Sequence, residues 1–287
     1  MKFPRMENHF LSARASFQEA RVVLLGCPFD GTASFRPGAR FGPSAIRRAS
    51  WGIETYSPYL DRDLEGIKIH DLGDLELPHG EKPLALRLIR RTVQKILREK
   101  KIPVLLGGDH LITLPVMEAM IRIYPDLHLL HLDAHTDLRE AYLGEPLSHS
   151  TVMRRVSDLL RSGRLFQIGP RSGTREEFEL GRKRGSILPF DERSVRKLVA
   201  NLRGKPLYVS LDLDVIDPSL LPGVGTPEPG GLLFDSFLSL LKKLSSLEVV
   251  GFDIVELTPD YDPTQISSVT AAVILREMIL TFVRPQR

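Results

Sequence analysis

The chain has few of the residues that cross-link secreted proteins or anchor membrane proteins. It contains one cysteine, Cys27, among 287 residues. A single thiol excludes an intramolecular disulfide framework and an all-sulfur metal site, and it favours a reducing compartment. Residues 1–9 lack the apolar core of a signal peptide, and no uninterrupted apolar run reaches the ~18–20 residues that span a bilayer. We therefore expect a cytoplasmic protein without a membrane partner.

The chain also has little net charge. Lys and Arg together number 39 and Asp and Glu 36, which leaves a formal net charge of +3. The runs of Lys and Arg are short, and none alternates with aromatic residues as a nucleic-acid surface would. We therefore predict no nucleic-acid partner. A hydrophobic content of 42% and a charged content of 26% are typical of a globular domain with a full core.

Short apolar runs alternate with longer amphipathic segments along nearly the whole chain. The apolar runs predict eight strands, at 21–26, 67–71, 103–106, 127–132, 165–168, 187–190, 207–211 and 249–254. The amphipathic segments predict helices at 43–50, 83–99, 111–124, 148–161, 174–184, 193–202, 234–246 and 265–283. This alternation is typical of an α/β protein with a mostly parallel sheet covered on both faces, although eight strands also fit a closed barrel. No segment resembles a linker, so we predict a single domain over residues 1–287.

Charged side chains follow two of the predicted strands directly. The runs 127–132 and 207–211 are followed by carboxylate and imidazole groups: Asp133, His135, Asp137, Asp212 and Asp214. Unpaired charge beside buried strands is costly, and alternation along a strand would point residues i, i+2 and i+4 to one side. Carboxylates with some imidazole suit hard divalent cations. Either cluster alone is equally a solvated strand end or a helix cap, but the two together favour a metal site.

A third strand end adds one more candidate ligand. The run 103–106 continues into Gly107, Gly108, Asp109 and His110, and the paired glycines would let the backbone turn and bring His110 to the same edge. The Pro- and Gly-rich segment 217–231 follows a charged strand end as well. We interpret it as a rigid active-site loop, with a plain connecting loop as the alternative.

Three segments resemble the metal motifs of the ureohydrolases, the arginase–agmatinase family: 107–110, 133–137 and 210–218. Further similar segments follow in the family's order at 26–31, 35–43, 168–173, 226–231 and 253–256, so that the resemblance covers about residues 22–275. It implies a three-layer αβα fold around an eight-stranded parallel sheet. It also implies trimers or hexamers.

The resemblance further implies two manganese ions in each chain. Carried over residue by residue, one ion would take His110, Asp133, Asp137 and Asp212, and the other His135, Asp133, Asp212 and Asp214. Asp109 would orient a ligand instead of binding metal. His128 and His131, within or beside their strand, are interpreted as structural.

The implied chemistry is hydrolysis of a guanidino compound to urea and an amine. Two close cations make hydroxide available at neutral pH. Glu256 would hold the guanidinium by a charge-assisted pair, and His149 would carry a proton. Without the resemblance, the sequence alone would favour interpreting Glu256 as a surface residue and His149 as a residue near a helix cap. A metal-binding protein without activity is a less favoured alternative, as is an amide hydrolase of the deacetylase type with one zinc.

The sequence says least about the rest of the substrate. The segments 35–43 and 226–231 resemble agmatinases more than arginases, and 138–148 does not match the arginase segment that receives an amino acid, so agmatine is the leading substrate. Glu140 or Glu145 would attract its terminal amine. Arg139 would instead favour an acidic tail, as in 4-guanidinobutyrate. Aminopropylagmatine and arginine remain alternatives.

Overall fold

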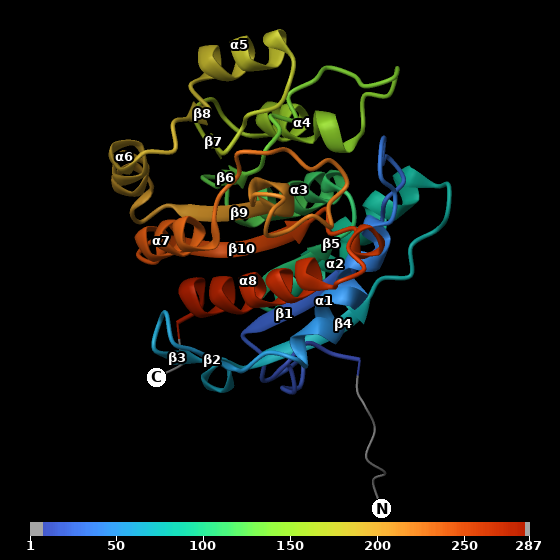
Figure 1. The fold of residues 1–287 in the computed structure, drawn as a ribbon, viewed down its shortest axis with the longest axis vertical. Coiled ribbons are helices and arrows are strands. Elements are labelled where there is room, and N and C mark those ends of the chain that lie inside the picture. Colours follow the sequence, from blue (N-terminus) through green and yellow to red (C-terminus); the bar gives the residue numbers. More distant parts are fainter. Residues whose placement is uncertain (1–7, 285–287) are drawn as a thin grey trace, which may run out of the picture.

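An open, parallel, eight-stranded sheet is the centre of the computed structural model, which describes residues 8–284 (Figure 1). The strand order is β4-β1-β5-β10-β9-β6-β7-β8, and all neighbouring pairs are parallel. The strands are β1 (Val22–Cys27), β4 (Ile69–Asp74), β5 (Ile102–Gly107), β6 (His128–Leu132), β7 (Leu165–Ile168), β8 (Ile187–Leu188), β9 (Pro206–Asp212) and β10 (Glu248–Val255). Because β4 and β8 lie at opposite ends of the sheet and do not pair with each other, the closed barrel is excluded and the αβα expectation is confirmed.

Helices cover both faces of the sheet and enclose two separate hydrophobic cores. One core includes side chains of α1, α6, α7 and α8, and the other includes α2, α3 and α4, with α5 at its margin through Leu180. In Figure 1, α8 crosses in front of the sheet and α2 and α3 lie behind it. The bounds are α1 (Gly42–Ser50), α2 (Lys82–Arg98), α3 (Thr113–Ile123), α4 (Val152–Leu159), α5 (Arg175–Arg184), α6 (Glu192–Leu202), α7 (Phe234–Leu244) and α8 (Ile266–Phe282).

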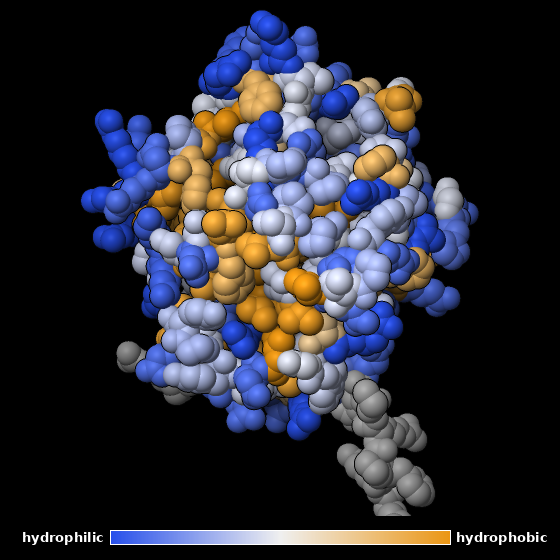
Figure 2. All heavy atoms as spheres, in the orientation of Figure 1, coloured by the Kyte–Doolittle hydropathy of each residue, from blue (hydrophilic) through white to orange (hydrophobic). Residues whose placement is uncertain are grey.

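The central strands are largely apolar because both of their faces are buried. In β9, Leu207, Val209 and Leu211 point into one core, while Tyr208 between them points into the other. All four side chains are fully buried. Figure 2 shows apolar residues gathered in the middle of the face that α8 covers, with hydrophilic residues around its margin.

The structure departs from the sequence-based elements mainly at their ends. The helices expected from 111 and 148 begin as 3-10 turns, His110–Ile112 and His149–Thr151, before α3 and α4. A two-stranded hairpin, β2 (Tyr56–Ser57) with β3 (Arg62–Asp63), was not anticipated, because two residues are too short for an alternating pattern. Among the described residues, no helix is long and apolar enough to cross a membrane.

Four adjacent strands in the middle of the sheet end at the same edge. They are β5, β10, β9 and β6 in that spatial order, although β10 is the last strand in sequence. The carboxyl ends of parallel strands in an open sheet form the crevice where such folds bind ligands. The candidate residues of the sequence follow these four strand ends.

Candidate metal centre and active site

The turn after β5 carries His110 into this crevice. A Cβ atom on Gly108 would lie 1.8 Å from the carbonyl oxygen of Phe29, so the chain needs glycine there for close approach of two backbones. Asp109 then caps the 3-10 turn, where its carboxylate accepts the backbone N–H of Leu111 at 3.0 Å. The predicted turn is present, and its cause is close packing against the segment after β1.

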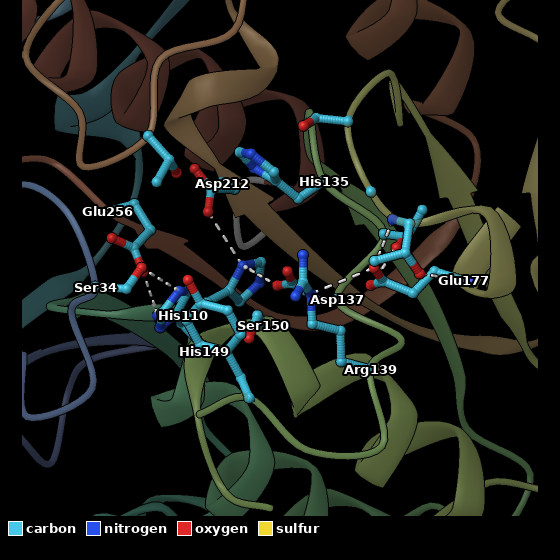
Figure 3. A pocket seen from close by; sticks show the side chains of 16 residues that line it. Ser34, His110, His135, Asp137, Arg139, His149, Ser150, Glu177, Asp212 and Glu256 are labelled. Carbon is cyan, nitrogen blue, oxygen red and sulfur yellow. Dashed lines mark hydrogen bonds and ion pairs between the residues drawn. The ribbon is translucent and has the colours of Figure 1, made fainter. Parts of the chain in front are cut away.

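Hydrogen bonds fix which nitrogen of His110 faces the crevice. The Ser210 hydroxyl donates to Asp253 Oδ1 at 2.7 Å, so its oxygen accepts the N–H of His110 Nε2 at 2.9 Å. His110 Nδ1 then faces the carboxylate oxygens (Figure 3). The distances from Nδ1 are 3.1 Å to Asp133, 3.1 Å to Asp212 and 3.4 Å to Asp137.

The carboxylates converge for a different reason from the one we expected. Strand β6 ends at Leu132, and Asp137 adopts a left-handed backbone conformation with φ 52°. Asp214 lies in a 3-10 turn whose N-terminal residue, Asp212, accepts its backbone N–H at 2.9 Å. Turns therefore bring the side chains together, and the expectation that strand alternation continues to Asp137 and Asp214 was wrong.

The six candidate ligands form one continuous cluster. His135 Nδ1 lies 2.9 Å from Asp214 Oδ2 and 3.5 Å from Asp133 Oδ1. Two groups of potential ligand atoms each lie within 4.8 Å of one another: His110, His131, Asp133 and Asp137 in the first, and Asp133, His135 and Asp214 in the second. Asp133 belongs to both groups, and Asp212 joins the cluster through its contact with His110.

His131 contacts this cluster, which the sequence reasoning missed. The Gln167 amide donates to the Thr136 carbonyl at 2.7 Å and to His131 Nδ1 at 3.0 Å. His131 Nδ1 is therefore an acceptor, and Nε2 carries the hydrogen that is donated to Asp133 Oδ2 at 2.7 Å. A protonated Nε2 cannot bind a metal, so His131 orients Asp133. Its position two residues before Asp133 was the available signal.

Burial makes the cluster electrostatically demanding. The exposed fractions of Asp133, Asp137, Asp212 and Asp214 are 5% or less. Burial, together with neighbouring carboxylates, holds the pKa values of Asp137 and Asp212 well above their ordinary range. For Asp133 burial acts in the same direction, but His131 and His110 outweigh it and lower its pKa. Burial opposes protonation of His110 and His135, but the same carboxylates outweigh it and raise the pKa values of both imidazoles. A set of oxygen donors with two imidazoles fits hard divalent ions.

Glu256 lies beside the cluster at the end of β10. Its backbone is left-handed, with φ 68°, and its side chain is 8% exposed. Such conformations of a non-glycine residue are costly and concentrate at functional sites. Glu256 Oε1 accepts the backbone N–H of His110 at 2.8 Å. Burial, followed by the charges of Asp212 and Asp109, raises its pKa well above the ordinary value.

One cavity of about 250 Å³ connects these groups. In Figure 3, Glu256 and Ser34 lie on one side of His110, and Arg139 and Glu177 lie on the other. The lining residues include His110, His135, Asp137, His149, Asp212, Thr226 and Glu256. Burial lowers the pKa of His149 to about 4, so this imidazole is neutral at pH 7 and can accept a proton.

Comparison with known proteins agrees with this arrangement of strand ends and cavity. The profile of the Arginase family matches residues 20–281. The chain belongs to the arginase family. An agmatinase of Bacillus cereus is 46% identical over 281 residues, which cover 96% of each chain. A guanidinobutyrase of Pseudomonas aeruginosa is 36% identical and matches 90% of this chain and 85% of its own.

A solved structure supports the same assignment. The agmatine ureohydrolase of Thermoplasma volcanium has a TM-score of 0.87 and 35% identity, with 97% of this chain and 95% of that chain covered. This member of the arginase family is therefore a hydrolytic enzyme, an amidinohydrolase. The hypothesis of a metal-binding protein without activity is wrong, and so is the hypothesis of a deacetylase-type amide hydrolase.

The loop 217–231 follows the turn that carries Asp214. Thr226 lines the cavity, and the Arg171 guanidinium donates to the carbonyl oxygens of Asp214 and Glu228, each at 2.7 Å. These bonds tie the loop to the end of β7 and to the turn that carries Asp214. Arg171 therefore connects the loop, through Glu228, with the turn that carries Asp214.

The residues considered for the substrate tail lie in different places. Glu140 pairs with Arg154 at 2.7 Å and is 68% exposed in its side chain, and Glu145 pairs with Lys82 at 2.7 Å. Neither belongs to the described lining of the cavity. Arg139 does line it, with its Nε 3.4 Å from a Glu177 carboxylate oxygen.

Proposed function

We propose that this arginase-family enzyme hydrolyses agmatine to putrescine and urea in the cavity beside Glu256. The observation that carries the proposal is a buried carboxylate, Glu256, next to a cluster of four further carboxylates and two imidazoles. A guanidinium is a planar cation, and a desolvated carboxylate with a raised pKa gains most from such a partner. The relationship to an agmatinase at 46% identity supports the choice of substrate.

The carboxylate and imidazole cluster would hold two manganese ions. We assign one to His110, Asp133, Asp137 and Asp212, and the other to His135, Asp133, Asp212 and Asp214. Two divalent ions there would supply hydroxide at neutral pH for attack on the guanidinium carbon. The Ser210 and His131 contacts hold His110 and Asp133 in the orientation that binding needs.

Glu256 has the task of orienting the substrate. Its Oε1 is already held by the backbone N–H of His110, while Oε2 lies near Gly225, where an added Cβ would be 3.3 Å away. The carboxylate is thus fixed before substrate arrives. Because Glu256 is close to Asp212 and bonded to the backbone of His110, a guanidinium bound to it would lie beside the cluster.

His149 would deliver the proton that the leaving amine requires. It is neutral at pH 7 and lines the same cavity as Glu256 and His110. A neutral imidazole can take the proton released on attack and then give it to the departing nitrogen. Putrescine leaves as the amine and urea as the second product.

The surroundings of Arg139 favour agmatine over 4-guanidinobutyrate. Its guanidinium is paired with Glu177 and lies over the Tyr142 ring, 4.8 Å from the centroid. A cation already engaged in this way attracts an acidic tail weakly. Aminopropylagmatine and arginine remain the other candidates.

Urea release from agmatine, aminopropylagmatine, 4-guanidinobutyrate and arginine, measured with metal content per chain, tests the proposal. We expect agmatine to have the highest kcat/KM and the active protein to hold two manganese ions. A higher kcat/KM for another substrate would overturn the substrate assignment. One zinc in the active protein would overturn the two-metal site.

We also propose that the enzyme works in the cytoplasm as a homotrimer or homohexamer, as the family resemblance implies. The buried thiol of Cys27 is compatible with a reducing compartment. Light scattering of the purified protein measures the assembly directly. A monomer at micromolar concentration would contradict it.

A further inference from the structure

The segment after β1 lies against the imidazole of His149. Thr32 Oγ1 is 3.3 Å from His149 Nδ1 and accepts the backbone N–H of His149 at 3.0 Å. Ser34 Oγ is 3.3 Å from the other ring nitrogen, Nε2 (Figure 3). Both ring nitrogens therefore have a hydroxyl partner, and both partners come from one loop that is far from His149 in sequence.

Asp109 determines the direction of these hydrogen bonds. Its buried Oδ2 accepts both the backbone N–H and the hydroxyl of Thr32, each at 2.9 Å. A threonine hydroxyl has one hydrogen, and here that hydrogen points to Asp109. The Thr32 oxygen can then only accept from His149, so the hydrogen of the neutral imidazole must be on Nδ1.

We propose that Thr32 is a positioning residue that holds neutral His149 in its Nδ1–H tautomer. This inference rests on the proposed role of His149 as the proton carrier. With the hydrogen on Nδ1, Nε2 carries the lone pair and becomes the nitrogen that takes up and releases the proton. Fixing the tautomer of a catalytic histidine through its second nitrogen is a general way to direct proton transfer.

Ser34 completes the arrangement on the Nε2 side. It is exposed and lines the cavity. Its hydroxyl can donate to Nε2 when the imidazole is neutral and accept from Nε2 when the imidazole is protonated, because a hydroxyl rotates freely. Ser34 therefore links His149 Nε2 to solvent, and the proton that His149 carries can be exchanged without rearrangement of the loop.

Substitutions that keep or remove one hydroxyl test this role. Thr32→Val keeps the shape of the side chain and should lower kcat for agmatine by about 10- to 100-fold, with KM changed by less than about threefold. Thr32→Ser restores the hydroxyl and should recover kcat to within about threefold of the wild type. Thr92→Val is the matched control, because the Thr92 hydroxyl bonds the Leu88 carbonyl within α2, away from the cavity.

Nitrogen-15 NMR of the full-length protein, with nitrogen-15 in its histidines, measures which ring nitrogen of His149 is protonated and does not depend on activity. With Mg²⁺ added as a diamagnetic ion, we expect a protonated Nδ1 and an unprotonated Nε2 for His149, assigned by the loss of its signals in His149→Asn. In Thr32→Val the Nε2–H form should become populated, whereas in Thr32→Ser and Thr92→Val the spectrum should match that of the wild type.

An Nε2–H tautomer in the wild type, or wild-type kcat in Thr32→Val, would overturn the inference. If the wild type fails to release urea from agmatine, the proposed substrate fails, while the tautomer measurement still decides the role of Thr32. The two failures are therefore distinguishable.

Discussion

The bodies of the central strands and their carboxyl ends differ sharply within a few residues. Along β9, Leu207 and Val209 are apolar, regular and fully buried. At the end of the same strand, Asp212 is also buried but carries an ionisable carboxyl group, and the chain turns into a 3-10 segment. The strand bodies contribute hydrophobic stabilisation, while the ends hold groups that oppose folding when they lack a counter-charge.

The same contrast holds across the sheet. The chain segments after β6 and β10, the strands on either side of β9, carry the left-handed residues Asp137 and Glu256, whereas the strands before them are parallel and paired. Rigid, well-packed strands can hold strained and charged residues at their ends, because the surrounding core over-determines the positions of those residues. Five substitutions test this division of roles.

Removal of the charge at the end of β9 should have the largest effect on activity. Asp212→Asn should lower kcat/KM for agmatine by at least about 10³-fold, because it removes a shared ligand of the proposed metal pair. In metal-free protein the same change should raise Tm by about 2–4 °C, since burial and the charges of Asp214 and Asp133 oppose ionisation of Asp212. Urea assays and calorimetry measure the two effects. Wild-type activity would refute the ligand assignment.

Glu256→Gln should have the next largest effect, and it should separate substrate binding from metal binding. We expect kcat/KM to fall by about 10²- to 10³-fold, because the charge-assisted pair with the guanidinium is lost. Metal content per chain, measured by mass spectrometry, should not change. A parallel loss of metal would show that Glu256 supports the cluster instead of the substrate.

A change in a strand body should affect stability and leave the chemistry intact. Leu207→Ala in β9 should lower the free energy of unfolding by about 2–5 kcal/mol, since the side chain is fully buried. The kcat of the remaining folded protein should be that of the wild type. Leu143→Ala is the control, because Leu143 is 87% exposed and its loss should change stability by less than about 0.5 kcal/mol. Denaturant unfolding monitored with activity distinguishes the two.

His149 should give a pH dependence of stability with a defined sign. Its folded-state pKa is about 4, below the value of 6.5 for an unperturbed histidine, so between these pH values the unfolded chain binds more protons. The contribution of His149 to the free energy of unfolding should therefore increase by about 1–3 kcal/mol from pH 4 to 6.5 and then level off. Unfolding curves of metal-free wild type and His149→Asn should diverge over this range. A constant difference between them would contradict the burial of a neutral imidazole.

The smallest effect on activity and stability is expected for Glu140, which lies on the surface outside the cavity lining. Glu140→Gln removes an exposed ion pair with Arg154 and Arg155, and it should change stability by less than about 1 kcal/mol. The KM for agmatine should stay within about twofold of the wild type, because Glu140 is directed to these arginines. A tenfold increase in KM in steady-state assays would show that Glu140 contacts the substrate tail.

Most strands of the sheet were predictable because they are largely apolar runs between turn signals, although β4 also contains His70, Asp71 and Asp74. All eight appear in the structure, with β4 three residues longer at its end than expected and β8 shortened to Ile187–Leu188. The order of the strands was not predictable, since β10 inserts between β5 and β9 and only packing determines that choice. The hairpin of β2 and β3 had no sequence signal because each of its strands has only two residues.

The residues of the cluster were identified from their types and from the strands they follow, and their convergence was expected for the wrong geometric reason. His131 was interpreted as structural, and its contact with Asp133 was missed because the sequence does not show which group a buried histidine will meet. Its hydrogen bond to Asp133 depends on Gln167, which is 36 positions away in sequence and adjacent only in the folded sheet. Thr32 was missed likewise.

The sequence by itself determined the fold class, the strands and the chemical character of the crevice, because these depend on local apolar patterns and on the order of charged residues along the chain. The tertiary structure decided which charges meet, which nitrogen of His110 faces the cluster and which loop contacts His149. Those features depend on hydrogen bonds between distant segments, and the direction of a hydrogen bond is fixed only when donor and acceptor are brought together.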